Sequence, residues 1–224
     1  MDIRLAIDRL ASSDPQRTVF GSSHHQYHLQ EPVSAADLLA FDAHHRIALP
    51  DDYRTYLEAG NGIAGPFYGV FPLGEVDDNG SETVPFEASN LMGRLDRPFL
   101  KTQAWNLPSA DLQPPEIPAG VSDEEEQRLL DAYDSRLENT YWSPSVMDGC
   151  IPISHRGCAL RVWLAVNGPM AGTIWNDDRA DDRGLYPVRD RSGQAMTFAQ
   201  WMAVWLESPA EHTTLLATGG PEAI

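Results

Sequence analysis

The sequence predicts an α+β fold in which an antiparallel or mixed sheet is backed by helices. Apolar residues follow helical spacing in the first part of the chain, follow the period of a strand in the last third, and return to helical spacing near residue 200. Helices and strands do not alternate regularly, which argues against a doubly wound parallel sheet. The length of 224 residues and the hydrophobic fraction of 42% suit one folded domain, which we expect over residues 1–208.

The N-terminal part is expected to be mainly helical. Ser34 can cap one helix, and Pro50 with the two aspartates after it suits the first turn of another. Glycines at positions 60 and 62 would end that second helix, because glycine accepts a positive φ at low cost. The expected elements are helices over 3–11, from 34 and from 50 to 59, an edge strand near 27–29, and a strand over 67–73.

The middle of the chain is expected to be irregular except for one long helix. Residues 74–89 form a predicted acidic loop, and a short helix is expected over 91–95. A connector with four prolines, 107–121, precedes the helix predicted over 122–141, in which Ser122 and Glu125 form a capping box. We interpret about 107–142 as a helical, acidic insertion within the domain.

The C-terminal third predicts the sheet and a closing helix. Alternation over 160–166 indicates a strand with two buried faces, and Asn167-Gly168 predicts a tight turn into the next strand. Thr197 and Gln200 form a second capping box, after which four large apolar side chains share one helical stripe. Further strands are expected over 150–154, 172–176 and 185–188, and residues 209–224 are predicted to be a flexible tail.

The charge excludes several classes of partner. Lys and Arg number 16 against 33 Asp and Glu, which gives a net charge of −17, and Lys101 is the only lysine. Binding to nucleic acid or to an acidic membrane surface depends on basic residues, so neither is expected. The N-terminal residues do not form a targeting segment and no run is apolar enough to span a bilayer, so we expect a cytoplasmic protein. Its oligomeric state is left open.

Acidic residues gather in stretches that contain no basic residue. None occurs between Arg54 and Arg94 or between Lys101 and Arg128, and each stretch holds six acidic residues. They form either solvated loops and helix N-termini or a face that meets a basic partner, and the second alternative requires that the clusters converge. The candidate partner-binding residues are Glu75, Asp77, Asp78, Glu82, Glu87, Asp123, Glu124, Glu126, Asp177, Asp178, Asp181 and Asp182.

The chemistry-bearing residues do not form a recognisable catalytic or metal-binding pattern. The chain lacks a nucleophile elbow, a Walker loop and a dinucleotide-binding fingerprint, so no catalytic residue and no cofactor are predicted. Paired carboxylates in 177–182 could serve a hydrolase, but solvated loop charge is the favoured interpretation. The histidines and cysteines lack the spacing of a zinc site, so no metal is predicted; they are His24, His25, His28, His44, His45, Cys150, His155 and Cys158. Cys150, inside an apolar strand, is expected to be an inert buried thiol.

Two groups of motifs carry a resemblance to a known superfamily. The first is LPDDYRTYL at 49–57, GNG at 60–62 and GPFYGV at 65–70. The second is DGCIPI at 148–153, GC at 157–158, WLAVNG at 163–168, GTIW at 172–175, FAQW at 198–201 and WL at 205–206. In this order they resemble the SUKH superfamily, which includes fungal cell-wall regulators of the Smi/Knr type and many bacterial proteins. The resemblance covers about 27–73 and 146–207.

The resemblance implies an α+β SUKH-like domain and, for bacterial members, a role as an immunity protein that binds and neutralises a toxin, often a nuclease. It implies no catalytic residue. Together with the negative charge, it predicts a non-enzymatic binding protein whose partner is a basic toxin domain. The alternative is a regulatory or scaffold protein of the Smi/Knr type without a toxin. The chain departs from the family pattern at Ile63, where a second glycine often follows Asn-Gly, and in the longer, more acidic stretch 74–141.

Overall fold

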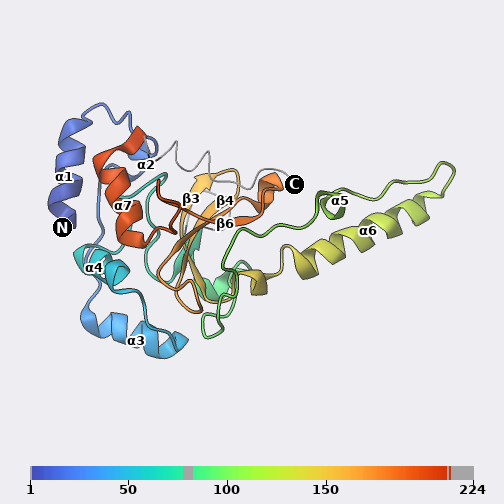
Figure 1. Ribbon diagram of the computed structural model, residues 1–224, viewed down its shortest axis with the longest axis horizontal. Coiled ribbons are helices and arrows are strands. Elements are labelled where there is room, and N and C mark those ends of the chain that lie inside the picture. Colours follow the sequence, from blue (N-terminus) through green and yellow to red (C-terminus); the bar gives the residue numbers. More distant parts are fainter. Residues whose placement is uncertain (1, 78–82, 211, 213–224) are drawn as a thin grey trace.

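The computed structural model describes residues 2–77, 83–210 and 212. A group of helices lies on one side of a four-stranded sheet, and a long arm projects from the other side (Figure 1). The elements are α1 (Ile3–Ser13), α2 (Ser22–His25), α3 (Ala35–His45), α4 (Asp51–Ala59), β1 (Glu75–Asp77), β2 (Thr83–Pro85), η1 (Phe86–Ala88), α5 (Ser109–Leu112), α6 (Asp123–Thr140), η2 (Pro144–Met147), β3 (Cys150–Gly157), β4 (Leu160–Ala165), β5 (Ile174–Asp177), η3 (Arg179–Asp181), β6 (Leu185–Pro187) and α7 (Phe198–Glu207).

The main sheet is antiparallel with the strand order β3-β4-β5-β6, and β1 and β2 form a separate antiparallel pair. Val162 and Leu164 on β4 point into the core that the helices cover, whereas Trp163 points into a second apolar cluster on the opposite face. There Trp163 lies directly opposite Trp175 in the register of β4 and β5. Both the predicted fold class and the predicted alternation of β4 are therefore confirmed.

Helices α1, α4 and α7 form the layer over the first face of the sheet (Figure 1). The ring of Phe198 packs edge-on against Tyr53 and Tyr56, with centroids 4.9 and 5.2 Å apart. The capping box of α7 is present as predicted, and the Asp52 carboxylate also accepts a hydrogen bond from Ala199 N at 2.9 Å. The predicted helical stripe is buried, and each large side chain in it contributes about 1.5–3 kcal/mol of burial.

The segment 67–73, predicted as a strand, is not one. Its backbone turns at Phe67 and Gly69, whose φ angles are 58° and 103°, and only Val70 forms a bridge, with Ile63. A Cβ at position 69 would lie 2.0 Å from the Ile63 carbonyl oxygen, so glycine is required there. Ile63 itself has a φ of 75°, which is unfavourable for a β-branched residue.

Five further local predictions are wrong. Residues 91–95 are not helical, and the supposed loop 74–89 contains β1, β2 and η1. The connection from β4 to β5 turns at Gly168–Ala171 and not at Asn167-Gly168, because the chain stays paired only as far as Ala165 and Thr173. The capping box of α6 is incomplete, since Ser122 accepts from Glu125 N while the Glu125 carboxylate pairs with Arg128. The edge strand at 27–29 is a single bridge, Leu29 to Ile63.

The arm consists of the connector that leads outward through α5 and of α6, which returns to the body (Figure 1). All 18 residues of α6 are described, and none of them is buried. Tyr133 Oη donates to the Leu112 carbonyl oxygen at 2.6 Å, and Arg136 donates to the Asp111 carbonyl oxygen at 2.6 Å. These contacts join α6 to α5, so the two sides of the arm stabilise each other.

Of the predicted tail, only residues 209, 210 and 212 are described, and they are helical. His212 is buried against the rings of Phe67 and Trp201. The remainder of 209–224 lies outside the described residues. Within the described part of the chain, no helix combines the length and apolar character needed to cross a membrane.

Candidate functional site

The acidic residues at the start of α6 form the most exposed candidate surface. Asp123, Glu124 and Glu126 are exposed and lie at the end of the arm that is farthest from the body (Figure 1). An α-helix of 18 residues is about 27 Å long, which is the distance by which this turn is separated from the base of the arm. The sequence of α6 contains seven acidic and two basic residues. We call α6 and the connector 107–122 the acidic arm.

The acidic residues near β1 and β2 have different environments. Glu75 is half-buried and accepts a hydrogen bond from Thr83 Oγ1, whereas Glu87 on η1 is exposed. Asp77 is buried, and its carboxylate lies 3.1 Å from His155 Nε2. Asp78 and Glu82 lie outside the described residues. Of the described residues in this group, only Glu87 is therefore exposed.

Asp177 and Asp178 are not solvated loop charges, so that interpretation was wrong for both. Asp177 is held by Arg179, whose Nε and Nη2 donate to the two carboxylate oxygens at 2.8 and 2.7 Å. Asp178 is 1% exposed and pairs with Arg156 of β3. Buried carboxylates require such partners, because desolvation of an unpaired charge is costly.

The paired charges around Asp177 and Asp178 also include the contact that holds the base of the acidic arm. Tyr186 Oη donates to the Asp178 carboxylate, and Arg183 lies 3.7 Å from it. Arg179 donates to the carbonyl oxygen of Tyr141, the residue after α6. Asp181 and Asp182 remain exposed on this loop. Arg179 and Arg183, which lie beside these aspartates in the sequence, are therefore structural partners of Asp177 and Asp178.

The acidic clusters do not converge on one face in the described part of the chain. The turn Asp123–Glu126 lies at the arm tip, whereas β1, β2 and the loop after β5 belong to the body (Figure 1). A single acidic surface built from all three clusters is therefore ruled out for the described residues. The acidic arm is the largest continuous acidic element among them.

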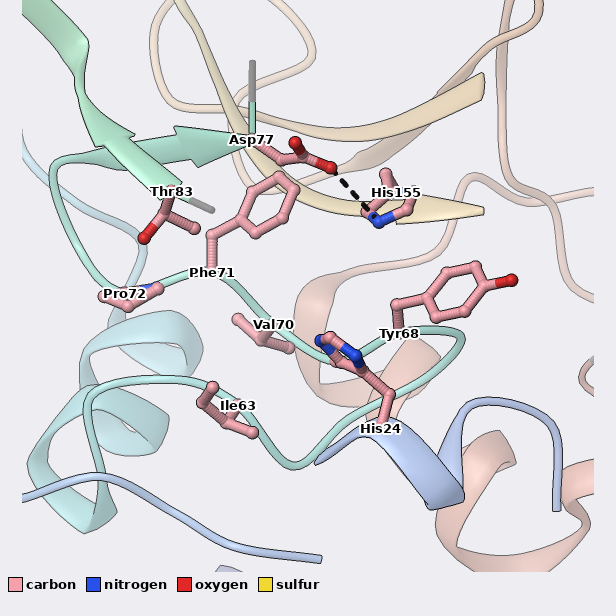
Figure 2. Close-up of a pocket in the computed structure, with 10 residues that line it drawn as sticks. His24, Ile63, Tyr68, Val70, Phe71, Pro72, Asp77, Thr83 and His155 are labelled. Carbon is pink, nitrogen blue, oxygen red and sulfur yellow. Dashed lines mark ion pairs between the residues drawn. The ribbon is translucent and has the colours of Figure 1, made fainter. Parts of the chain in front are cut away.

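A small pocket with a volume of about 60 Å³ lies between the 63–72 segment and β3 (Figure 2). His155 faces Asp77 on one side and stacks on the ring of Tyr68, with centroids 4.7 Å apart and planes at 14°. His24 from α2 approaches Tyr68 edge-on at 5.8 Å. Ile63, Val70, Phe71 and Pro72 supply apolar walls.

The hydrogen bonds of His155 restrict the chemistry of this pocket. Its Nδ1 accepts from Gly157 N at 3.0 Å, so Nε2 carries the proton that faces Asp77. Burial lowers the pKa of His155 although the Asp77 charge acts in the opposite direction, so the ring is neutral near pH 7. Both nitrogens are therefore engaged within the chain. The pair orders the turn after β3 and leaves no free ring nitrogen to act as a general base.

The other predicted thiol and histidine positions also have structural surroundings. Cys150 is buried as expected, and burial raises its pKa. His25 is buried, accepts from Tyr27 N through Nδ1 at 3.0 Å and packs edge-on against Trp205. His24 and His28 are exposed. Neither the His24–His28 set nor the set of Cys150, His155 and Cys158 forms a three-ligand cluster among the described residues.

Sequence reasoning missed an aromatic group at the base of the acidic arm. The ring of Trp105 lies 5.7 Å from Tyr141, which lies 5.1 Å from Trp142. Lys101 Nζ is 4.7 Å from the Trp105 ring, and the Arg179 guanidinium is 5.3 Å from the Trp142 ring. Trp142 is 44% exposed. The sequence signal that could have indicated this group is the pair of adjacent aromatic residues, Tyr141 and Trp142, directly after α6.

Scans against protein-family models, curated proteins and solved structures gave no match to this chain.

Proposed function

We propose that this chain is a non-enzymatic binding protein whose acidic arm contacts a basic surface of a protein partner. The acidic arm carries the proposal, because it projects from the body and its tip presents three exposed carboxylates. By contrast, Asp77, Asp177 and Asp178 are buried and contact His155, Arg179 and Arg156 within the chain. The net charge of −17 adds a long-range field that speeds encounter with a basic partner.

The base of the arm supplies an anchor for such a complex. Interface energy concentrates in a few buried aromatic and arginine side chains, whereas charges at the rim mainly affect the association rate. Trp142 is an exposed indole beside the body, and Arg179 fixes the adjacent backbone at Tyr141. A partner that contacts the arm along its length would cover Trp142 and align its basic residues with α6.

We infer that the partner is a basic toxin domain, with nucleases as the expected class, and that the chain acts in the cytoplasm as a SUKH-type immunity protein. This part of the proposal depends on the motif resemblance and on the charge. The engaged nitrogens of His155 and the small volume of its pocket favour binding over catalysis. The alternative, a Smi/Knr-type regulatory or scaffold protein, shares the same motifs and needs no toxin.

The test is to express the chain in cells that carry the toxin gene encoded beside its own gene. We expect the wild-type chain to restore growth and to bind the toxin at a rate that falls as salt concentration rises. The arm variant is the triple substitution Asp123→Lys, Glu124→Lys and Glu126→Lys. The control variant reverses three exposed acidic residues on the body, Asp8→Lys, Glu31→Lys and Glu58→Lys.

Both variants change the net charge equally, so they separate the position of the charges from their number. We expect the arm variant to associate at least tenfold more slowly than the control variant. Equal rates for the two variants would overturn the role of the arm. Failure of the wild-type chain to bind the toxin or to restore growth would overturn the immunity function and favour the scaffold alternative.

A further inference from the structure

The C-terminal end of α3 is held against η1 by aromatic packing. The rings of Phe41 and His45 are tilted against each other at 53° with centroids 4.4 Å apart, and the Phe41 ring lies 6.3 Å from that of Phe86. His45 and Phe86 are also 6.3 Å apart. These rings fix the relative positions of two segments that are far apart in the sequence. The neighbouring side chains, His44 and Glu87, are thereby brought to the same place.

Three potential metal ligands meet above this packing. One nitrogen each from His44 and His45 and a carboxylate oxygen of Glu87 all lie within 4.8 Å of one another. Two ligands of a tetrahedral zinc ion are about 3.4 Å apart, so closing the site requires side-chain movements on the order of 1 Å. His44 and Glu87 are exposed and His45 is half-buried, so their side chains have room for this movement.

The local electrostatics favour a cation at this position. The two histidines are in the last turn of α3, where the free backbone carbonyls give the helix end a partial negative charge. The neighbouring Arg46 is directed to Asp96, 3.5 Å away.

We propose that His44, His45 and Glu87 bind a divalent zinc ion, which joins α3 to η1. Two imidazoles and one carboxylate match the ligand preference of zinc and leave a coordination position for water. The sequence showed only an adjacent histidine pair, and the fold supplies the third ligand from a distant segment. This site is separate from the acidic arm, so it goes beyond the proposed function and stands independently of it.

The experiment uses the full-length chain without a histidine tag. Zinc binding is measured by calorimetry, and the melting temperature is measured with and without added Zn²⁺. Cobalt(II) serves as a spectroscopic probe, because its visible absorption depends on the geometry and number of its ligands. The site variants are His44→Ala and Glu87→Gln. The matched controls are His28→Ala and Glu58→Gln, which remove an exposed histidine and an exposed carboxylate elsewhere.

We expect one equivalent of zinc to bind to the wild-type chain and to raise its melting temperature. Each site variant should lose at least tenfold in affinity and the zinc-dependent rise in melting temperature, whereas the controls should retain both. All four variants should melt like the wild-type chain without metal, since each altered side chain is exposed. Unchanged zinc affinity in the site variants, or no zinc binding by the wild-type chain, would overturn the proposal.

Discussion

The loop after β5 and the first turn of α6 are both rich in acidic residues, yet they have opposite environments. Asp178 is 1% exposed and pairs with Arg156, whereas Asp123 is exposed at the tip of the arm. The difference follows from the position of arginine. Arg179 lies within the first cluster, Arg183 directly follows it and Arg156 reaches it from β3, whereas the first turn of α6 contains no arginine. An acidic cluster is therefore a candidate partner surface only where its carboxylates remain exposed, as those of Asp123, Glu124 and Glu126 do, although Arg128 pairs with Glu125 in the same turn.

The largest expected effect comes from breaking the buried network. Replacing Asp178 by alanine leaves the mostly buried guanidinium of Arg156 without its carboxylate and Tyr186 Oη without an acceptor. Removing one partner of a buried ion pair typically costs about 3–5 kcal/mol. We therefore expect Asp178→Ala to lower the free energy of unfolding by about that amount in urea denaturation.

The matched substitution on the arm is Asp123→Ala. Asp123 is exposed, so its replacement should change the free energy of unfolding by no more than about 0.5 kcal/mol. Equal losses for Asp178→Ala and Asp123→Ala would show that the two clusters do not differ as the structure indicates.

Acid should destabilise the body through histidines that are buried in their neutral form. Burial, aided by the charge of His24, lowers the pKa of His25 from 6.5 to about 4. Between these values the unfolded chain binds a proton that the folded chain does not, so stability falls as the pH falls through this window. A shift of this size corresponds to about 3 kcal/mol, lost by about pH 4.

The variant that tests this effect is His25→Asn, whose side-chain oxygen can replace Nδ1 as acceptor for Tyr27 N. Its free energy of unfolding should depend less steeply on pH between 6.5 and 4 than that of the wild-type chain. Part of the dependence should persist, because burial also lowers the pKa of His212, to about 3. His28→Ala removes an exposed histidine and should leave the slope unchanged. Identical slopes for His25→Asn and the wild-type chain would contradict the assignment.

The elements that the sequence predicts well are those determined by neighbouring residues. The capping box of α7 joins Thr197 to Gln200 within one helical turn, and the two faces of β4 follow from strict alternation. The segment 67–73 was predicted wrongly as a strand, because its bends at Phe67 and Gly69 depend on contacts with Ile63 that local apolar spacing does not reveal.

The candidate site was less predictable, because its interactions join distant parts of the chain. Asp77 meets His155, and Asp178 meets Arg156, across connections whose geometry only the folded sheet determines. The position of Glu87 beside His44 and His45 could not be predicted for the same reason. By contrast, the exposure of Asp123 followed from its place in the first turn of a polar helix, which local sequence does predict.

The smallest expected effect tests whether the arm is stabilised separately from the body. Tyr133→Phe removes the hydrogen bond to the Leu112 carbonyl oxygen, which should cost about 0.5–1.5 kcal/mol. Since α6 buries none of its residues and pairs mainly with α5, this cost should appear as faster hydrogen exchange in α6. The free energy of global unfolding should barely change, because the arm can open while the sheet stays intact. If the free energy of global unfolding in urea instead falls by the full cost of the hydrogen bond, the arm unfolds together with the sheet. The acidic surface would then depend on the same core as the buried network.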